Sequence, residues 1–279
     1  MKVLLLLPLL FMLLTTPVSG QNSKLADQYY LEGEYQKAGD LYLKLHETAK
    51  KNGNFIYFNK YIECLLALRE YDQAEKEIQA QMKAQPDDYS MLVTLGNVQE
   101  RIGNYEAAQA SYRMAIEKLP ARIDAITRLG NAFLSQAKYD EAIVTYEKGE
   151  KLLDKPGIFS YQLADLYKRN GDMSKMIEQY LYSLQSSPDR LENIQNMLQR
   201  SLKAEDYDEL LSQLYVFIQD YPETDYFPEM LAWTFMQQKD YSKAMRQAKA
   251  LDKRMGENGL RVYRLATIAA NDKDYATAI

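Results

Sequence analysis

The sequence has little of the residue types from which metal sites and many active sites are built. Its 279 residues include one cysteine, Cys64, and one histidine, His46. A single cysteine cannot form a disulfide within its own chain, and we find neither a metal-ligand cluster nor a Cys–His or Ser–His–Asp catalytic set. We expect Cys64 to be a packed small residue inside a helix, and His46 to lie at the surface or to cap a helix.

A glycine-rich phosphate-binding loop is also missing, because the glycines occur singly. Carboxylate pairs such as Glu75/Glu77 and Asp87/Asp88 occur on polar faces or at the starts of helices, where acidic side chains suit the helix dipole. We therefore expect no catalytic residue, no metal and no cofactor, and the chain is not expected to be an enzyme.

A strongly basic stretch is the third absence. The chain has 34 lysines and arginines against 39 aspartates and glutamates, which gives a net charge of −5, and the two signs are interspersed. Nucleic-acid binding needs a basic surface that follows the phosphates. We therefore expect no nucleic-acid partner.

What the sequence does contain is one recurring pattern, a tyrosine followed three residues later by an alanine. The pattern begins first at residue 35, next at residue 71 after 36 residues, and then every 34 residues until residue 275. A period of this length is typical of a solenoid of stacked units rather than of a single globular core. The copies, two of them degenerate, are Tyr35/Ala38, Tyr71/Ala74, Tyr105/Ala108, Tyr139/Ala142, Met173/Met176, Tyr207/Leu210, Tyr241/Ala244 and Tyr275/Ala278.

Each repeated unit is predicted to contain two amphipathic helices. In residues 88–119 and 122–153, apolar or small side chains recur at i, i+3, i+4 and i+7, which places them on one helix face. A short polar turn separates the two halves of each unit. Proline follows the second half in several units, where it stops the outgoing helix.

The unit resembles the tetratricopeptide repeat. It reads Leu-x2-Leu-Gly-x2-hydrophobic, then Gly/Asp-x-Tyr-x2-Ala-x3-Tyr-x2-Ala, then Pro, and repetition makes this match specific. The resemblance implies an all-α fold, a right-handed superhelical solenoid of antiparallel helix pairs with about seven and a half repeats in residues 21–279. The repeats are expected near residues 22–54, 55–88, 89–122, 123–156, 157–190, 191–224, 225–258 and, incomplete, 259–279.

Two features of the repeats predict how the helices pack. The eighth position of the unit is usually small, and Gly96 and Gly130 there are expected to let the two helices of a unit approach closely. Repeat five departs from the pattern at its two methionines, and repeat six at Leu198, Leu210 and Phe217. We expect these larger residues to be accommodated by local repacking between the helices, with a bend near residues 187–188 as the alternative.

The first twenty residues have the pattern of a secretory signal peptide. Lys2 is followed by an apolar run over residues 3–14 and by a small, turn-prone stretch to Gly20. The run is too short for a membrane span of about 20 residues, although an uncleaved anchor is an alternative. We expect cleavage before Gln21 and export to the periplasm or cell envelope, with secretion as the alternative and no membrane insertion of the mature chain.

The last repeat is expected to be incomplete, since it ends at Ile279 within its second helix. A solenoid normally finishes with a polar capping helix. We therefore expect the chain to be the front part of a longer protein.

The resemblance also implies a binding surface. In the tetratricopeptide family the first helix of each unit lines the inside of the superhelix and contacts an extended peptide or a helix. Trp233 is expected either to anchor a ligand in the groove or to pack sideways against the neighbouring helix. The residues that form the family's clamp for chaperone C-termini are matched poorly in this chain. The positions that the resemblance assigns to this surface are Asn97, Arg101, Arg128, Asn131, Tyr161, Asp165, Lys168 and Trp233.

These observations favour a non-catalytic scaffold of the cell envelope that binds a peptide or helix of a partner protein. The alternative is an extracytoplasmic sensing or docking arm of a longer membrane receptor or enzyme. A membrane span beyond residue 279 would favour the arm.

Overall fold

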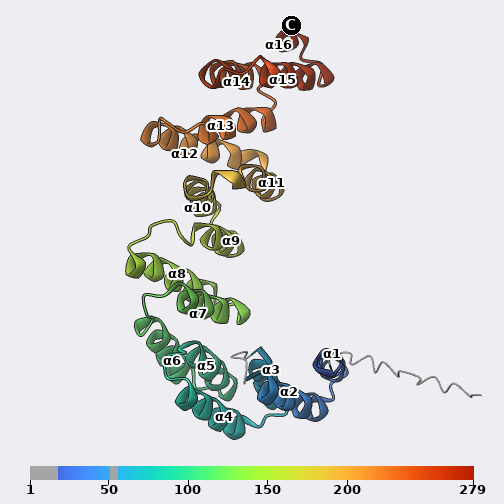
Figure 1. The fold of residues 1–279 in the computed structure, drawn as a ribbon, viewed down its shortest axis with the longest axis vertical. Coiled ribbons are helices and arrows are strands. Elements are labelled where there is room, and N and C mark those ends of the chain that lie inside the picture. Colours follow the sequence, from blue (N-terminus) through green and yellow to red (C-terminus); the bar gives the residue numbers. More distant parts are fainter. Residues whose placement is uncertain (1–17, 51–55) are drawn as a thin grey trace, which may run out of the picture. The chain divides into compact units, whose positions relative to one another are not determined.

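A computed structural model describes residues 18–50 and 56–279, and every regular element in these ranges is helical (Figure 1). The helices form consecutive antiparallel pairs, which confirms the predicted all-α solenoid. The elements are α1 (Val18–Leu31), α2 (Tyr35–Lys50), α3 (Ile56–Ala67), α4 (Tyr71–Ala84), α5 (Ser90–Ile102), α6 (Tyr105–Glu117), α7 (Ile123–Ser135), α8 (Tyr139–Leu153), α9 (Ser160–Asn170), α10 (Met173–Ser186), the 3₁₀ turn η1 (Pro188–Arg190), α11 (Leu191–Ser201), the 3₁₀ turn η2 (Ala204–Asp206), α12 (Tyr207–Asp220), α13 (Tyr226–Gln237), α14 (Tyr241–Met255), α15 (Leu260–Asn271) and α16 (Tyr275–Ala278).

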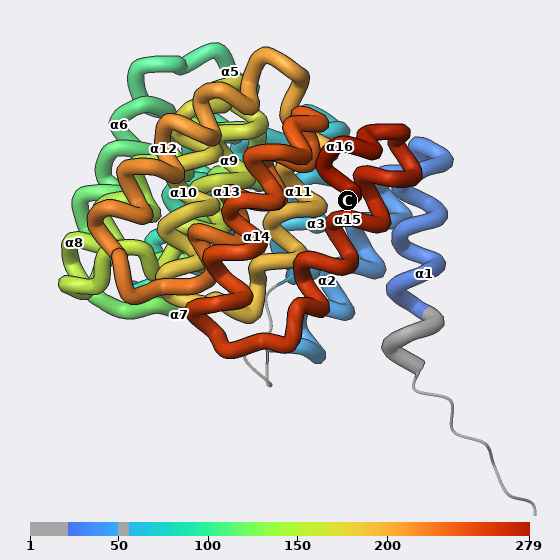
Figure 2. The backbone as a smooth tube through the Cα atoms, turned by 90° about the horizontal axis from the view of Figure 1, so that it is seen from above, coloured from blue at the N-terminus to red at the C-terminus, as the bar shows by residue number. Residues whose placement is uncertain are grey.

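The chain divides into two compact units, Met1–Met114 and Ala115–Ile279. In the described part of the first unit, helices α1 to α5 bury a core with aromatic, aliphatic and small side chains. In the second unit, the helices of the pairs α7 and α8, α9 and α10, and α13 and α14 pack on each other, and α14 and α15 lie side by side (Figure 2).

The recurring tyrosine or methionine is the first residue of the second helix in each described pair, from α2 to α16. Three residues later, the side chain is completely buried in all pairs except the last. The position is therefore a packing constraint that the 34-residue period repeats. It also holds Met176 and Leu210, both with 0% exposure, so the bulkier residues of repeats five and six are accommodated in the core.

A close contact between glycine and tyrosine joins the two helices of the regular repeats. A Cβ atom on Gly130 would lie 2.5 Å from the Tyr146 ring, and one on Gly96 would lie 2.2 Å from the Tyr112 ring. Both rings are almost fully buried. The expected close approach at Gly96 and Gly130 is confirmed, because any larger residue would overlap the ring.

The region around the predicted bend contains two short 3₁₀ turns. Pro188 begins η1 and leads directly into α11, and η2 leads directly into α12. Leu198 and Leu210 are fully buried and Phe217 is 6% exposed. Repeat six therefore repacks its joint with large apolar side chains, as expected.

The prediction for His46 is wrong. Its side chain is 5% exposed, and its ring lies 5.2 Å from the ring of Phe58 on α3. His46 is a core residue because the next helix pair covers it. The prediction for Cys64 is confirmed, since it lies in α3 with 0% exposure and burial raises the pKa of its thiol to about 12.

The predicted signal peptide lies mostly outside the described residues. Residues 1–17 are not described, and α1 begins at Val18. Among the described residues, no helix is long and apolar enough to cross a bilayer.

Candidate functional site

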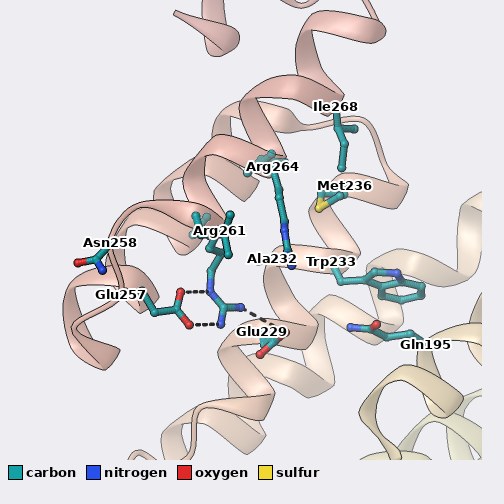
Figure 3. A pocket seen from close by; sticks show the side chains of 13 residues that line it. Gln195, Glu229, Ala232, Trp233, Met236, Glu257, Asn258, Arg261, Arg264 and Ile268 are labelled. Atoms are coloured by element: carbon teal, nitrogen blue, oxygen red, sulfur yellow. Dashed lines mark hydrogen bonds and ion pairs between the residues drawn. The ribbon is translucent and has the colours of Figure 1, made fainter.

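A hollow of about 580 Å³ lies in the second unit, between α13 and α15 (Figure 3). It is formed mostly by first helices of successive pairs, together with the turn that precedes α15. The lining residues are Gln195 from α11, Glu229, Ala232, Trp233 and Met236 from α13, Ala248 from α14, Glu257 and Asn258 from the turn, and Leu260, Arg261, Arg264, Leu265 and Ile268 from α15.

The hollow occurs beside a helix pair in which the residues equivalent to Gly130 and Tyr146 are both small. Counting by 34 residues from Gly130 and Tyr146 leads to Ala232 and Ala248, which both line the hollow. At the regular joint the tyrosine ring fills the space beside the glycine, whereas at this joint neither of the two positions has a ring. The missing volume gives a physical reason for a hollow at this place in the repeat.

Trp233 contributes an aromatic surface to this hollow. The side chain is half-buried, and its ring lies 6.3 Å from the Tyr207 ring at an interplanar angle of 50°. Figure 3 shows Trp233 beside Gln195, with Met236 and Ile268 farther along the same hollow. Trp233 therefore contacts a neighbouring helix and also faces the hollow, and its role as a groove anchor stays a prediction.

Arg261 supplies a charged edge that two carboxylates hold in place. Its guanidinium donates hydrogen bonds to both carboxylate oxygens of Glu257, at 3.1 and 3.0 Å, and its Nη1 lies 3.2 Å from Glu229 Oε1. The hydrogen bond from Arg261 lowers the pKa of Glu257, and the same bond raises the pKa of Arg261. These contacts connect α13, the turn and α15.

Arg264 offers a second positive charge at the same hollow. It is exposed, and Figure 3 shows its side chain extending from α15 toward α13. Within residues 18–50 and 56–279, we find no hydrogen bond or ion pair from its guanidinium. Its charge acts on Glu257 at a distance, so its donors remain accessible to a ligand.

Two of the sequence-predicted site residues, Asn97 and Arg101, lie on α5 in the first unit. Asn97 is half-buried and Arg101 is exposed. The positive charge of Arg101 acts on the carboxyl of Glu63, whose pKa is nevertheless raised because the surrounding protein desolvates it.

On α7, Arg128 and Asn131 are both exposed and both have partners within the chain. Asn131 Oδ1 accepts a hydrogen bond of 3.3 Å from the Tyr146 hydroxyl. Arg128 forms an i,i+4 ion pair with Asp124, with a nitrogen-to-oxygen distance of 3.8 Å. Asn131 therefore also orients the interlocking tyrosine.

On α9, Tyr161, Asp165 and Lys168 are half-buried. Asp165 accepts a hydrogen bond of 2.8 Å from Arg169 Nε. The guanidinium of Arg190 lies over the Tyr161 ring, 5.0 Å from its centroid.

Of the eight predicted residues, Trp233 alone lines the hollow between α13 and α15. Sequence reasoning missed Arg261 and Glu229, whose roles depend on contacts between successive repeats. Arg264 and Glu229 could have been found, since they are the counterparts of Arg128 and Tyr161 in later repeats, and the family resemblance assigns those positions to the binding surface.

Metal chemistry has no donor set in the described part of the chain. No group of three or more histidine, cysteine, aspartate or glutamate side chains there is placed to hold a metal ion. The side chains around the hollow are instead an apolar surface with charged and amide groups at its edge.

Two family models match the middle of the chain. Residues 65–123 match one model of the tetratricopeptide repeat, and residues 123–152 match another. A TPR repeat-containing protein of Methanocaldococcus jannaschii is 28% identical over 162 residues. The alignment covers 57% of this chain and 28% of that protein, so the chain spans little more than a quarter of this relative's length.

Solved tetratricopeptide structures also align with the chain. The TPR2AB domain of yeast Sti1 in its pHSP90 complex is 18% identical, with a TM-score of 0.31, and the match covers 94% of this chain and 98% of that one. A thermophilic TPR protein of Thermus thermophilus, TTC0263, is 19% identical, with a TM-score of 0.33 and coverage of 66% and 98%. Similarity at this level carries no information about a ligand.

The 34-residue period, the helix pairs and the two family matches agree with one another. Residues 65–152 of the chain therefore match the tetratricopeptide repeat family.

Proposed function

We propose that this protein is a non-catalytic interaction scaffold that holds a peptide or helix of a partner protein in the hollow between α13 and α15. Tetratricopeptide repeats commonly mediate contacts between proteins, which supports the general role. The single observation that carries the specific proposal is the 580 Å³ hollow with Trp233 on its wall.

The chemistry of the hollow favours a segment with an apolar anchor side chain. Trp233, Met236 and Ile268 offer aromatic, thioether and aliphatic surface, and Ile268 is 38% exposed. Large apolar and aromatic side chains that become buried on binding contribute most of the affinity at protein interfaces. A partner's leucine, methionine or phenylalanine would therefore be the anchor.

The charges at the edge favour an acidic residue beside that anchor. Arg264 has accessible donors, whereas Arg261 is held by Glu229 and Glu257. An acidic side chain of the partner can pair with Arg264 without displacing an internal ion pair. Arg261 with its two carboxylates then keeps the edge of the hollow rigid.

The location and the wider context belong to the same proposal. The signal-peptide pattern in residues 1–20 supports action in the periplasm or cell envelope, with secretion as the alternative. A docking arm of a longer membrane receptor or enzyme would use the same hollow. Detection of the processed chain in the envelope fraction, with Gln21 at its N-terminus, tests the location.

The binding role can be tested with peptides selected from a random library on the purified chain. Trp233 is the chain's single tryptophan, so its emission reports this hollow directly. We expect the selected peptides to combine a large apolar residue with a nearby acidic residue and to shift the Trp233 emission toward the blue as water is displaced. Trp233→Ala should weaken binding by at least about tenfold, as expected for a central aromatic anchor.

Tyr263→Ala is the matched control. Tyr263 lies on α15, is 71% exposed, and does not line the hollow. This variant should bind the peptides as the wild type does. Peptides that bind Trp233→Ala as tightly as the wild type, or that leave the Trp233 emission unchanged, would move the function to another surface.

A further inference from the structure

A second and separate cleft, of about 280 Å³, lies between the second helices α10 and α12. It shares no residue with the hollow between α13 and α15. The lining residues are Ser174, Glu178, Tyr182, Gln213, Val216, Phe217, Asp220 and Tyr221.

Three aromatic rings form one side of this cleft. The Tyr182 and Phe217 rings are 5.0 Å apart in an edge-on arrangement, and the Phe217 and Tyr221 rings are 6.0 Å apart. Phe217 is buried, whereas the two tyrosines are half-buried. Tyrosine surface is therefore available to a ligand, on a base that Phe217 holds in place.

Two carboxylates lie at the same cleft, and no lysine or arginine lines it. Glu178 and Asp220 line the cleft together with Tyr182, and burial and the negative charges of the two carboxylates raise the pKa of Tyr182. Neither carboxylate forms an ion pair within the part of the chain that the structure describes. The cleft thus combines negative charge with aromatic surface and has no internal cation.

Hydrogen bonds hold the two helices of the cleft together at one end. Gln213 Nε2 donates to the Ser174 carbonyl at 3.0 Å and to Glu209 Oε1 at 2.6 Å. The Ser174 hydroxyl donates to the same Glu209 oxygen at 2.6 Å. The spacing between α10 and α12 is therefore set before a ligand arrives.

We propose that this cleft binds a positively charged lysine or arginine side chain of a partner protein, with the cation between Glu178 and Asp220 and against the tyrosine rings. A cation beside an aromatic face is attracted by the electron density of the ring, and nearby carboxylates add to this attraction. A partner could then be held at two places, by an apolar anchor on the first helices and by a basic residue on the second helices.

The proposal is tested with two blocked tripeptides, acetyl-Gly-Lys-Gly-amide and its norleucine analogue, which has the same chain length and no charge. Binding is followed by NMR on the chain with ¹³C-labelled tyrosine rings, and Tyr182→Phe and Tyr221→Phe assign the two signals. We expect the lysine peptide to shift both signals saturably in the millimolar range, and the norleucine peptide to leave them in place.

The charge-neutral variant Glu178→Gln/Asp220→Asn should weaken lysine-peptide binding by roughly tenfold. Asp189→Asn/Glu192→Gln is the matched control, because it removes the same charges from exposed positions outside the cleft. This control should bind as the wild type does. The four substituted residues are exposed or half-buried, so both variants are expected to fold. Circular dichroism checks this expectation.

Three results would overturn the proposal. Equal shifts with the lysine and norleucine peptides would show that charge is not recognised. Unchanged binding in Glu178→Gln/Asp220→Asn would show that these carboxylates do not contribute. An equal loss in the control variant would show that only the net charge of the chain matters. None of these results depends on the hollow between α13 and α15, so the two proposals fail separately.

Discussion

The joint between α7 and α8 and the joint between α13 and α14 occupy equivalent places in the repeat, yet the first is filled by an aromatic ring and the second has two alanines that border the hollow. At the first joint, Gly130 makes room for the buried ring of Tyr146. At the second, Ala232 and Ala248 stand at the same two positions and both line the hollow. A difference of one aromatic ring separates a closed joint from a candidate binding site.

In the other helix pairs, the residues at the positions of Gly130 and Tyr146 are complementary in size. A small residue is paired with tyrosine, as in Ala164 and Tyr180, or two medium-sized residues are paired, as in Leu198 and Leu214. All four side chains are fully buried. The pair Ala232 and Ala248 does not follow this rule, because both residues are small, and this pair borders the hollow.

The largest stability change is expected when the filled joint is overpacked. Gly130→Ala places a Cβ atom 2.5 Å from the Tyr146 ring, which is 2% exposed. We expect a loss of about 1–3 kcal/mol in the free energy of unfolding, measured by urea denaturation.

Gly39→Ala is the control for this change. Its new Cβ atom would meet the nearest side-chain atom at an ordinary 3.4 Å, so alanine's better helix propensity should stabilise the chain by up to about 1 kcal/mol. A Gly130→Ala chain as stable as the wild type would contradict the close packing of this joint.

A smaller effect is expected from the hydroxyls of the interlocking tyrosines. Tyr42 donates a hydrogen bond of 2.6 Å to Asp27, which also receives one from Lys60. Tyr42→Phe should cost about 1 kcal/mol near neutral pH. The Tyr180 hydroxyl is buried and has no hydrogen-bond partner among the described residues, so Tyr180→Phe should be neutral or slightly stabilising.

The cost of Tyr42→Phe should depend on pH in a defined direction. Hydrogen bonds from Lys60 and Tyr42 lower the pKa of Asp27 in the folded chain. The stabilisation is therefore complete above the pKa of Asp27 in the unfolded chain and is lost as the pH falls through its folded pKa. Urea midpoints of the wild type and Tyr42→Phe should converge in acid, and a constant difference down to about pH 2 would contradict this account.

The smallest effect is expected at Cys64, where the folded chain should show almost no reaction. The thiol is fully buried, and burial together with the negative charge of Glu63 raises its pKa to about 12. A maleimide or disulfide reagent at about pH 8 should label Cys64 only as fast as the first unit opens. Rapid labelling of the native chain, followed by mass spectrometry, would contradict the packed environment.

The sequence predicted the fold well because the residues that pack between helices recur at the same positions of every 34-residue repeat. The recurring residue begins each second helix, and the glycine at position eight is tight against tyrosine, as at Gly96 and Tyr112. His46 was misjudged, since the ring that covers it belongs to the next helix pair and its burial is not visible in its own repeat.

The candidate site was predicted only in part, because the hollow lies where two repeat positions have small residues instead of a large side chain. Trp233 could be identified as an aromatic residue at a family binding position. The contacts of Arg261 with Glu229 and Glu257 join successive repeats, and a pattern within one repeat does not reveal them. Comparing Ala232 and Ala248 with their counterparts would have located the hollow.

The most direct test of this account converts the hollow joint into a filled one. Ala248→Tyr recreates the small–tyrosine combination of Ala164 and Tyr180, so the chain should remain folded. We expect the selected peptides to lose binding to Ala248→Tyr while its urea midpoint stays close to that of the wild type. Full peptide binding by a folded Ala248→Tyr chain would contradict the claim that the unfilled joint between α13 and α14 creates the binding site.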